Sequence, residues 1–104
     1  MKNRKEVIEM TNLEVIKKFL KQENAQTNLR NILNGYYYYK GRTLQTQQEA
    51  YRFCLYNYNT IIAFILDNTL YLNTKKYSST TSKIQTQLRN QATYTHYNIK
   101  EYEE

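Results

Sequence analysis

The sequence predicts an α+β fold in which helices flank a small, mainly antiparallel sheet of three to five strands. A capping-box pattern followed by an amphipathic stripe predicts an N-terminal helix, and a Ser/Thr run followed by apolar residues at i, i+4 and i+8 predicts a C-terminal helix. Between them, short segments alternate in polarity or are wholly apolar, as strands do. With 104 residues, we expect a single domain over 1–104, with flexible ends at about 1–10 and 99–104.

The N-terminal helix is predicted over about 12–23. Thr11 stands at the N-cap position and Glu14 follows three residues later, the spacing at which each side chain caps the other residue's backbone. Ile16 and Leu20 then fall on one helical face, whereas the neighbouring lysines fall outside it. The polar segment that follows indicates that the helix ends or bends there.

The next segment combines a short helical pattern with a run of four tyrosines. Residues 29–33 carry apolar side chains at helical spacing, which predicts one or two further helical turns that end at Gly35. Tyr36 to Tyr39 predict a strand, because tyrosine favours strands and alternation sends two of the four side chains to each face. Lys40 to Arg42 predict a turn with two positive charges.

A short middle helix is predicted over about 47–54. Thr46 and Glu49 repeat the capping-box spacing, and Ala50, Phe53 and Cys54 follow on one side of the expected helix. The predicted fold therefore contains three helices.

Three strands are expected after the middle helix. The first alternates in polarity, the second is apolar enough to be central, and the third returns with Leu70 and Leu72 on one face and Tyr71 on the other. These strands are predicted at residues 55–58, 61–66 and 69–73. Between the last two, Asp67 and Asn68 predict a two-residue hairpin turn, since both tolerate a positive φ angle.

The C-terminal helix is predicted over about 81–91. Ile84, Leu88 and Ala92 lie on one face, and the preceding Ser/Thr run supplies several N-cap candidates. Residues 94–98 are expected either to add an edge strand or to begin a loose tail.

Composition favours a binding surface. Tyrosine accounts for 12 residues and the net charge is +6, so flat aromatic area is combined with attraction to anions. The codon bias of an A+T-rich genome is the alternative source of the tyrosines. All 15 Lys and Arg precede residue 101, whereas the last four residues hold three glutamates. This acidic tail could fold back over a basic site or simply keep the chain in solution.

No catalytic or cofactor-binding motif is present, so we expect a non-enzymatic protein without cofactor or metal. Cys54 and His96 are the single cysteine and histidine, which cannot supply a closed set of metal ligands. A Cys–His pair is conceivable, but Cys54 stands beside apolar residues, where cysteine behaves as a small buried side chain. The lone cysteine suits a reducing cytosol, and neither a signal peptide nor a membrane span is expected.

Two surfaces are candidates for binding. Proteins that bind single-stranded nucleic acid stack the unpaired bases on aromatic rings and place cations beside the phosphate backbone. The partner-binding residues predicted on this basis are Tyr37, Tyr39, Lys40, Arg42, Lys75, Lys76, Lys83 and Arg89. The start of the C-terminal helix offers free N–H groups and hydroxyls for an anion, unless it is a plain N-cap. The anion-binding candidates there are Ser79, Thr80, Thr81 and Ser82.

Two motifs carry a resemblance to a known family. Residues 55–63 resemble the pattern LYSYNTxIA, and residues 77–89 resemble YSxTTSKHQxxLR, with Asn57 in place of Ser and Ile84 in place of His. Together they are similar to a family of small proteins encoded by phages and prophages of low-G+C bacteria, a domain of unknown function. The resemblance covers about a third of the chain and does not extend to the first 50 residues.

The resemblance implies an accessory phage protein. Proteins of this kind often antagonise host defence, so we expect an inhibitor of a bacterial defence complex, specifically an anti-CRISPR protein acting in the bacterial cytosol. The implied partner is the CRISPR effector or its guide RNA or DNA, and a homodimer is also conceivable. The alternative is a small basic protein that binds single-stranded nucleic acid through the same residues.

Overall fold

The computed structural model describes residues 10–27, 29–33, 36–41 and 44–103. Within these residues the chain forms two helices, a two-stranded sheet and a five-stranded sheet, which confirms the α+β class. The helices are α1 (Asn12–Leu20) and α2 (Ser79–Ala92). The strands are β1 (Leu29–Leu33), β2 (Tyr36–Gly41), β3 (Leu44–Glu49), β4 (Arg52–Asn57), β5 (Thr60–Leu66), β6 (Thr69–Asn73) and β7 (Asn98–Tyr102).

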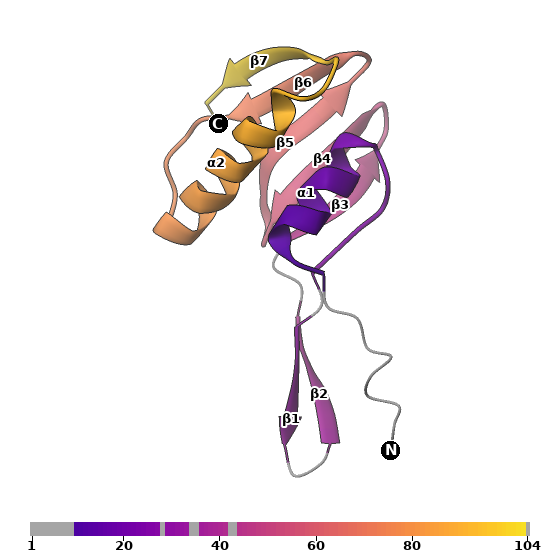
Figure 1. The fold of residues 1–104 in the computed structure, drawn as a ribbon, viewed down its shortest axis with the longest axis vertical. Coiled ribbons are helices and arrows are strands. Elements are labelled where there is room, and N and C mark those ends of the chain that lie inside the picture. Colours follow the sequence, from indigo (N-terminus) through magenta and orange to yellow (C-terminus); the bar gives the residue numbers. More distant parts are fainter. Residues whose placement is uncertain (1–9, 28, 34–35, 42–43, 104) are drawn as a thin grey trace.

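The five-stranded sheet is mixed. Its strands run in the order β3-β4-β5-β6-β7; the first four pair antiparallel through tight turns, and β7 pairs parallel with β6. The parallel pair follows from the connection, because α2 carries the chain back to the end of the sheet from which β6 started. Both helices lie on the same face of the sheet (Figure 1).

Each helix begins at the predicted kind of cap. At α1, the Thr11 amide donates to the Glu14 carboxylate over 2.8 Å, and the Glu14 amide donates to the Thr11 hydroxyl over 3.1 Å. This capping box is therefore confirmed. At α2, the Ser78 hydroxyl accepts from the Thr81 amide. Helix α1 ends at Leu20, three residues before the predicted end, and Gln22 adopts a left-handed backbone with φ 58°.

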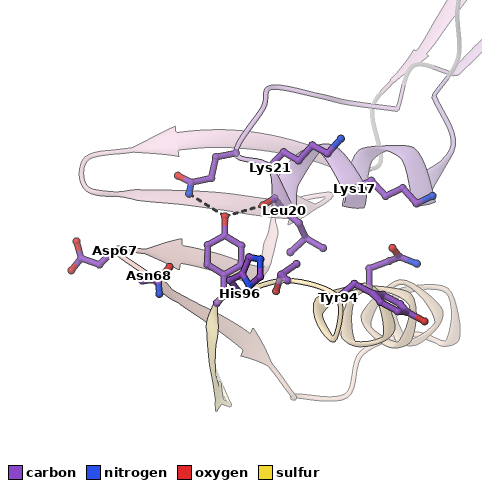
Figure 2. Close-up of a pocket in the computed structure, with 11 residues that line it drawn as sticks. Lys17, Leu20, Lys21, Asp67, Asn68, Tyr94 and His96 are labelled. Carbon is purple, nitrogen blue, oxygen red and sulfur yellow. Dashed lines mark hydrogen bonds between the residues drawn. The ribbon is translucent and has the colours of Figure 1, made fainter.

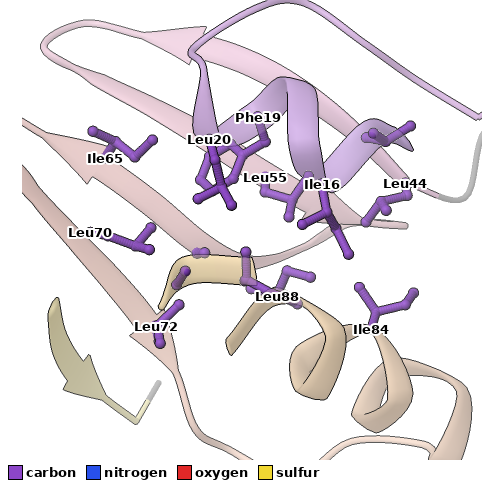
Figure 3. Close-up of a cluster of buried hydrophobic side chains, with 14 of the residues drawn as sticks. Ile16, Phe19, Leu20, Leu44, Leu55, Ile65, Leu70, Leu72, Ile84 and Leu88 are labelled. Atoms are coloured by element: carbon purple, nitrogen blue, oxygen red, sulfur yellow. The ribbon is translucent and has the colours of Figure 1, made fainter. Parts of the chain in front are cut away.

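The hydrophobic core lies between the helices and one face of the sheet (Figure 3). Phe19 of α1 stacks on Phe53 of β4 with ring centroids 5.9 Å apart. Alternation along the strands selects the other inward-facing side chains, including Leu70 and Leu72 of β6, as predicted. The core residues are Val15, Ile16, Phe19, Leu20, Leu44, Phe53, Leu55, Ile62, Ala63, Ile65, Leu70, Leu72, Ile84, Leu88 and Ala92.

The predicted middle helix over 47–54 is wrong. This part of the chain forms the β3–β4 hairpin, with a two-residue turn at Ala50 and Tyr51 where Ala50 has φ 50°. The side chains that looked like one helical face divide between the two faces of β4, with Phe53 in the core and Cys54 on the other side. Here the alternation of buried and exposed side chains along a strand decides the structure, and the weak helical spacing of the same residues does not.

The helical turns predicted at 29–33 are also wrong, because these residues form β1 and pair antiparallel with β2. The predicted tyrosine strand is confirmed and continues through Lys40 to Gly41, so these two residues belong to β2 and not to a turn. Gly35 and Arg42 lie outside the described residues. The two-stranded sheet projects away from the five-stranded sheet and its helices (Figure 1).

The remaining boundaries differ modestly from the predictions. The turn at Asp67 and Asn68 is confirmed, with φ 57° at Asp67. Strand β4 begins at Arg52 and ends at Asn57, so the next turn falls at residues 58–59. The edge strand expected at 94–98 lies instead at 98–102, within the segment expected to be a flexible end.

Candidate functional site

The face of the sheet opposite the helices carries an aromatic and basic surface. One residue from each strand pairs across the sheet in the order Gln47, Cys54, Phe64, Tyr71 and Lys100. Paired residues project to the same face, and this is the face opposite the core. We call this surface the open face. Its residues include Gln47, Glu49, Arg52, Cys54, Tyr56, Phe64, Tyr71, Lys100 and Tyr102.

Three rings and a guanidinium group form the centre of the open face. Phe64 and Tyr71 stack with centroids 4.6 Å apart and planes 15° apart, and Tyr102 approaches Phe64 at 5.6 Å and 51°. The Arg52 guanidinium carbon lies 4.8 Å from the centroid of the Phe64 ring. All four side chains are only half-buried, so this cluster offers fixed apolar area and a positive charge to a partner.

The carboxylate of Glu49 is occupied by donors from β4. It accepts from the Tyr56 hydroxyl, from Arg52 at 3.3 Å and from the Cys54 thiol at 3.6 Å. The hydrogen bond from Tyr56 is the main reason that the pKa of Glu49 lies below its ordinary value. Among these donors Arg52 offsets the charge of Glu49, so Lys100 supplies the remaining positive charge among the residues named for the open face.

The thiol of Cys54 is suited to a structural role. Burial is the main cause that raises its pKa to about 11, so the thiol stays protonated at neutral pH and is a poor nucleophile. Its hydrogen bond goes to Glu49, whereas His96 lines a pocket beside the ends of the two helices. Among the described residues, no group of three or more His, Cys, Asp or Glu side chains is placed to hold a metal ion.

The partner-binding residues predicted from the sequence lie in three segments of the chain. Tyr37, Tyr39 and Lys40 lie on β2, and Arg42 lies outside the described residues. The exposed Lys75 and Lys76 follow β6, and Lys75 lies 5.7 Å from the centroid of the Tyr77 ring. Lys83 and Arg89 lie on α2, where Arg89 pairs with Glu101 of β7. Gln85 of α2 donates to the Lys75 carbonyl over 3.1 Å, so the segment that carries Lys75 lies beside α2.

The predicted anion-binding segment forms the start of α2, and its hydroxyls are partly used by the fold. Thr81 is buried and accepts from the Asn57 amide over 2.6 Å, while Ser78 caps the helix. Ser79 and Thr80 are exposed, and Ser82 is half-buried. The two halves of the family-like pattern thus meet here, because Asn57 comes from the first motif and Thr81 from the second.

We call the hydrogen-bonded contact between Asn57 and Thr81 the polar junction, and the Asn73 side chain extends it. Its amide donates to the Ile61 carbonyl and to the Tyr77 hydroxyl, each over 3.0 Å, and the Gln85 amide donates back to the Asn73 carbonyl over 2.8 Å. These bonds fasten β5, β6 and α2 together. The two motifs therefore contain residues that hold the fold together: Asn57 and Thr81 bond to each other, and Tyr77 and Gln85 bond to Asn73 between the motifs.

A pocket of about 630 Å³ lies where α1 and α2 end beside the β5–β6 turn (Figure 2). Tyr97 is fixed against its wall, since its hydroxyl donates to the Leu20 carbonyl over 2.8 Å and accepts from the Gln22 amide over 3.1 Å. Asp67 lies at one end, and Lys17 lies toward the other. Sequence reasoning missed both this pocket and the open face, because pairing across strands and the meeting of helix ends leave no local signal.

Within the described residues, neither helix is long and apolar enough to cross a membrane. Comparison of the chain with protein-family models, with curated proteins and with solved structures finds no match.

Proposed function

We propose that this chain is a non-enzymatic binding protein whose open face holds single-stranded nucleic acid. The observation that carries the proposal is the cluster of Phe64, Tyr71 and Tyr102, with Arg52 against it, on the face that the helices leave uncovered. On a sheet face that neither described helix covers, half-buried rings are costly to leave in water and useful to a partner with flat surfaces.

The chemistry of the open face suits unpaired bases. Bases stack on aromatic rings regardless of sequence, and known sheets with exposed rings stack two or three bases at once. Lys100 at one margin can attract a phosphate, and Arg52, which pairs with Glu49, keeps that carboxylate from repelling one. A duplex keeps its bases inside, so this surface favours single strands over duplexes.

Two variants test the proposal by fluorescence anisotropy with a labelled oligonucleotide of about eight nucleotides. Tyr71→Ala should weaken binding by about 5- to 150-fold, which corresponds to about 1–3 kcal/mol for one stacked base. Lys100→Ala should reduce the slope of log affinity against log salt by about 0.7, the effect of losing one phosphate contact on a single strand.

The matched controls are Tyr51→Ala and Lys83→Ala. Tyr51 is 89% exposed in the β3–β4 turn, and Lys83 is exposed on α2, on the helix side of the sheet. Neither change should alter affinity. Equal losses in controls and test variants would show that charge and aromatic content act without a defined site, and a loss with Lys83→Ala alone would move the site to α2.

A second candidate function is inhibition of a bacterial defence complex, specifically a CRISPR effector. Its support is the family resemblance together with the projecting β1–β2 hairpin, whose strand β2 carries Tyr37, Tyr39 and Lys40. A projecting hairpin can enter a groove that the body of the protein cannot reach. Its tyrosines belong to the residue types enriched in interface hot spots.

Pull-down from bacterial lysate, with and without nuclease treatment, separates the two functions. Direct inhibition predicts that a protein partner is retained after nuclease and is lost with the Tyr37→Ala, Tyr39→Ala double variant. Nucleic-acid binding through the open face predicts that partners disappear after nuclease and that this double variant behaves like the wild type.

A further inference from the structure

The pocket at the ends of α1 and α2 is a second candidate site, on the helix side of the molecule and apart from the open face. Its volume of about 630 Å³ falls within the range of small-molecule sites. Its wall combines cations, rings, amides and one carboxylate, with Leu20 as an apolar contribution. A mixed lining of this kind indicates a polar ligand that has a flat ring and a charged group.

One wall of the pocket is cationic. Lys17 and Lys21 are four residues apart on and just after α1, so their side chains are neighbours, and both are exposed. Neither forms an ion pair within the described part of the chain, whereas the adjacent Lys18 pairs with Glu23 at 3.3 Å. Two adjacent unpaired ammonium groups at a pocket indicate an anionic group on the ligand, such as a phosphate.

The helix ends beside this wall do not present free carbonyls from their last residues. The Leu20 carbonyl accepts from Tyr97, and the Ala92 carbonyl accepts from the backbone and hydroxyl of Thr95 at 3.1 and 2.7 Å. A phosphate at the lysines would therefore not face these acceptors directly.

The opposite end of the pocket carries a hydrogen-bond acceptor, the carboxylate of Asp67. Asp67 lies there in the β5–β6 turn, far from Lys17, with Asn68 beside it (Figure 2). Asp67 takes part in no ion pair among the described residues, so its carboxylate is available to an N–H donor. His96 supplies a flat ring between these two ends, and Tyr94, which is 82% exposed, supplies another toward the end of Lys17 (Figure 2).

We propose that this pocket binds a 5′-phosphorylated nucleotide whose base carries an amino group. The phosphate contacts Lys17 and Lys21, the sugar and base lie along Tyr94 and His96, and the exocyclic amino group donates to Asp67. Carboxylates accept in this way from the amino group of cytosine. Uracil presents an oxygen at the same position, which the carboxylate would repel.

The test is a titration of the unmodified chain followed by NMR, because the single His96 gives one imidazole signal from inside the pocket. Cytidine monophosphate should move this signal at constant pH. Uridine monophosphate should bind about tenfold or more weakly, since a mismatched base contact costs that much in other sites. Cytidine and inorganic phosphate should each bind more weakly than cytidine monophosphate, because each has only part of the ligand.

Three variants assign the groups. Lys21→Ala should weaken both nucleotides, whereas Lys18→Ala, the matched control on the same helix, should weaken neither. Asp67→Asn should abolish the preference for cytidine over uridine, because an amide can donate as well as accept; asparagine also tolerates the left-handed backbone found there. Titration with 5′-phosphorylated and unphosphorylated oligocytidine then shows whether the natural ligand is the end of a strand or a free nucleotide. Binding of the phosphorylated oligomer at least as tight as that of cytidine monophosphate indicates a strand end, and weaker binding indicates a free nucleotide.

Several results would overturn the proposal. No movement of the His96 signal at millimolar nucleotide would exclude the site, and equal shifts from inorganic phosphate would reduce it to a general anion site. Equal affinity for the two nucleotides would refute the role of Asp67. The open-face variant Tyr71→Ala should leave this titration unchanged, so the pocket and the proposed strand-binding function can fail independently.

Discussion

The two faces of the five-stranded sheet are built from alternate residues of the same strands, yet they differ in chemistry. On the helix side, Phe53, Leu55 and Leu70 are almost wholly removed from water. On the open face, the intervening Phe64 and Tyr71 stack on each other but remain half-buried. Sequence alternation therefore assigns stability to one face and leaves an unusually aromatic surface on the other.

The difference between the two faces explains why sequence motifs do not locate the proposed contact surface. The most distinctive residues, in the segments 55–63 and 77–89, include Asn57 and Thr81, which join β4 to α2 through a buried hydrogen bond. The proposed contact residues are instead spread over β4, β5, β6 and β7, separated by core residues in the sequence. When a surface is assembled from residues on several strands, the sequence alone reveals only an excess of tyrosine and positive charge.

The largest expected effect is on the helix side. Leu55→Ala removes a fully buried side chain from the centre of the core, which should lower the free energy of unfolding by about 2–5 kcal/mol. Urea unfolding followed by circular dichroism measures this loss. A loss below about 1 kcal/mol would contradict the assignment of this face as the core.

The polar junction comes next. Thr81→Val keeps the shape of the side chain but removes the acceptor of the Asn57 amide, and Asn57 is only 2% exposed. An unpaired buried amide should lower the free energy of unfolding by about 1–3 kcal/mol. The neighbouring Thr80→Val is the control, because Thr80 is exposed and should change stability little. Equal effects of the two substitutions would show that Thr81 is not the critical partner.

A smaller effect on stability is expected on the open face. Tyr71→Ala removes one member of a stacked pair and should lower the free energy of unfolding by about 0.5–1.5 kcal/mol beyond the area that it exposes. Differential scanning calorimetry of Tyr71→Ala and Leu55→Ala under the same conditions compares the two losses of stability directly. If Tyr71→Ala is as destabilising as Leu55→Ala, the open face is a second core, and its role as a contact surface loses support.

The most subtle expected effect is on alkaline stability. The hydrogen bond to Glu49 raises the pKa of Tyr56 to about 12, and burial raises the pKa of Cys54 to about 11. Because both pKa values are raised by folding, this stabilisation is complete below pH 9 and is lost between about pH 9 and 12, as the unfolded chain ionises first. Unfolding at several alkaline pH values should give a shallower decline for Tyr56→Phe, and an unchanged decline would show that Tyr56 is not the coupled group.

The sequence predicted the parts of the fold that depend on local chemistry. The Thr11 cap, the Ser/Thr cap region of α2 and the Asp67 turn each rest on residues whose side chains or backbone preferences act within a few positions. Segments 29–33 and 47–54 failed because their helical spacing was weak and pairing within the β1–β2 and β3–β4 hairpins decided the outcome. The parallel pairing of β7 could not be predicted, since it depends on where α2 returns the chain.

The candidate sites were less predictable than the fold. Lys75, Lys76, Lys83 and Arg89 were chosen from the sequence for charge, but Arg89 pairs with Glu101 of β7. Tyr71 was predicted to face away from Leu70 and Leu72, which is confirmed, yet nothing in the sequence placed Phe64 beside it. The register of a sheet is needed to bring such residues together.

The three phenylalanines of the chain provide the most direct test of the open face. Phe19 and Phe53 stack in the core, whereas Phe64 stands in the aromatic cluster on the other side of the sheet. With ¹³C-labelled phenylalanine, a single-stranded oligonucleotide should move the NMR signals of Phe64 and leave those of Phe19 and Phe53 in place, and the matching duplex should have little effect. Binding that leaves the Phe64 signals unmoved would contradict the proposal that the open face holds the strand.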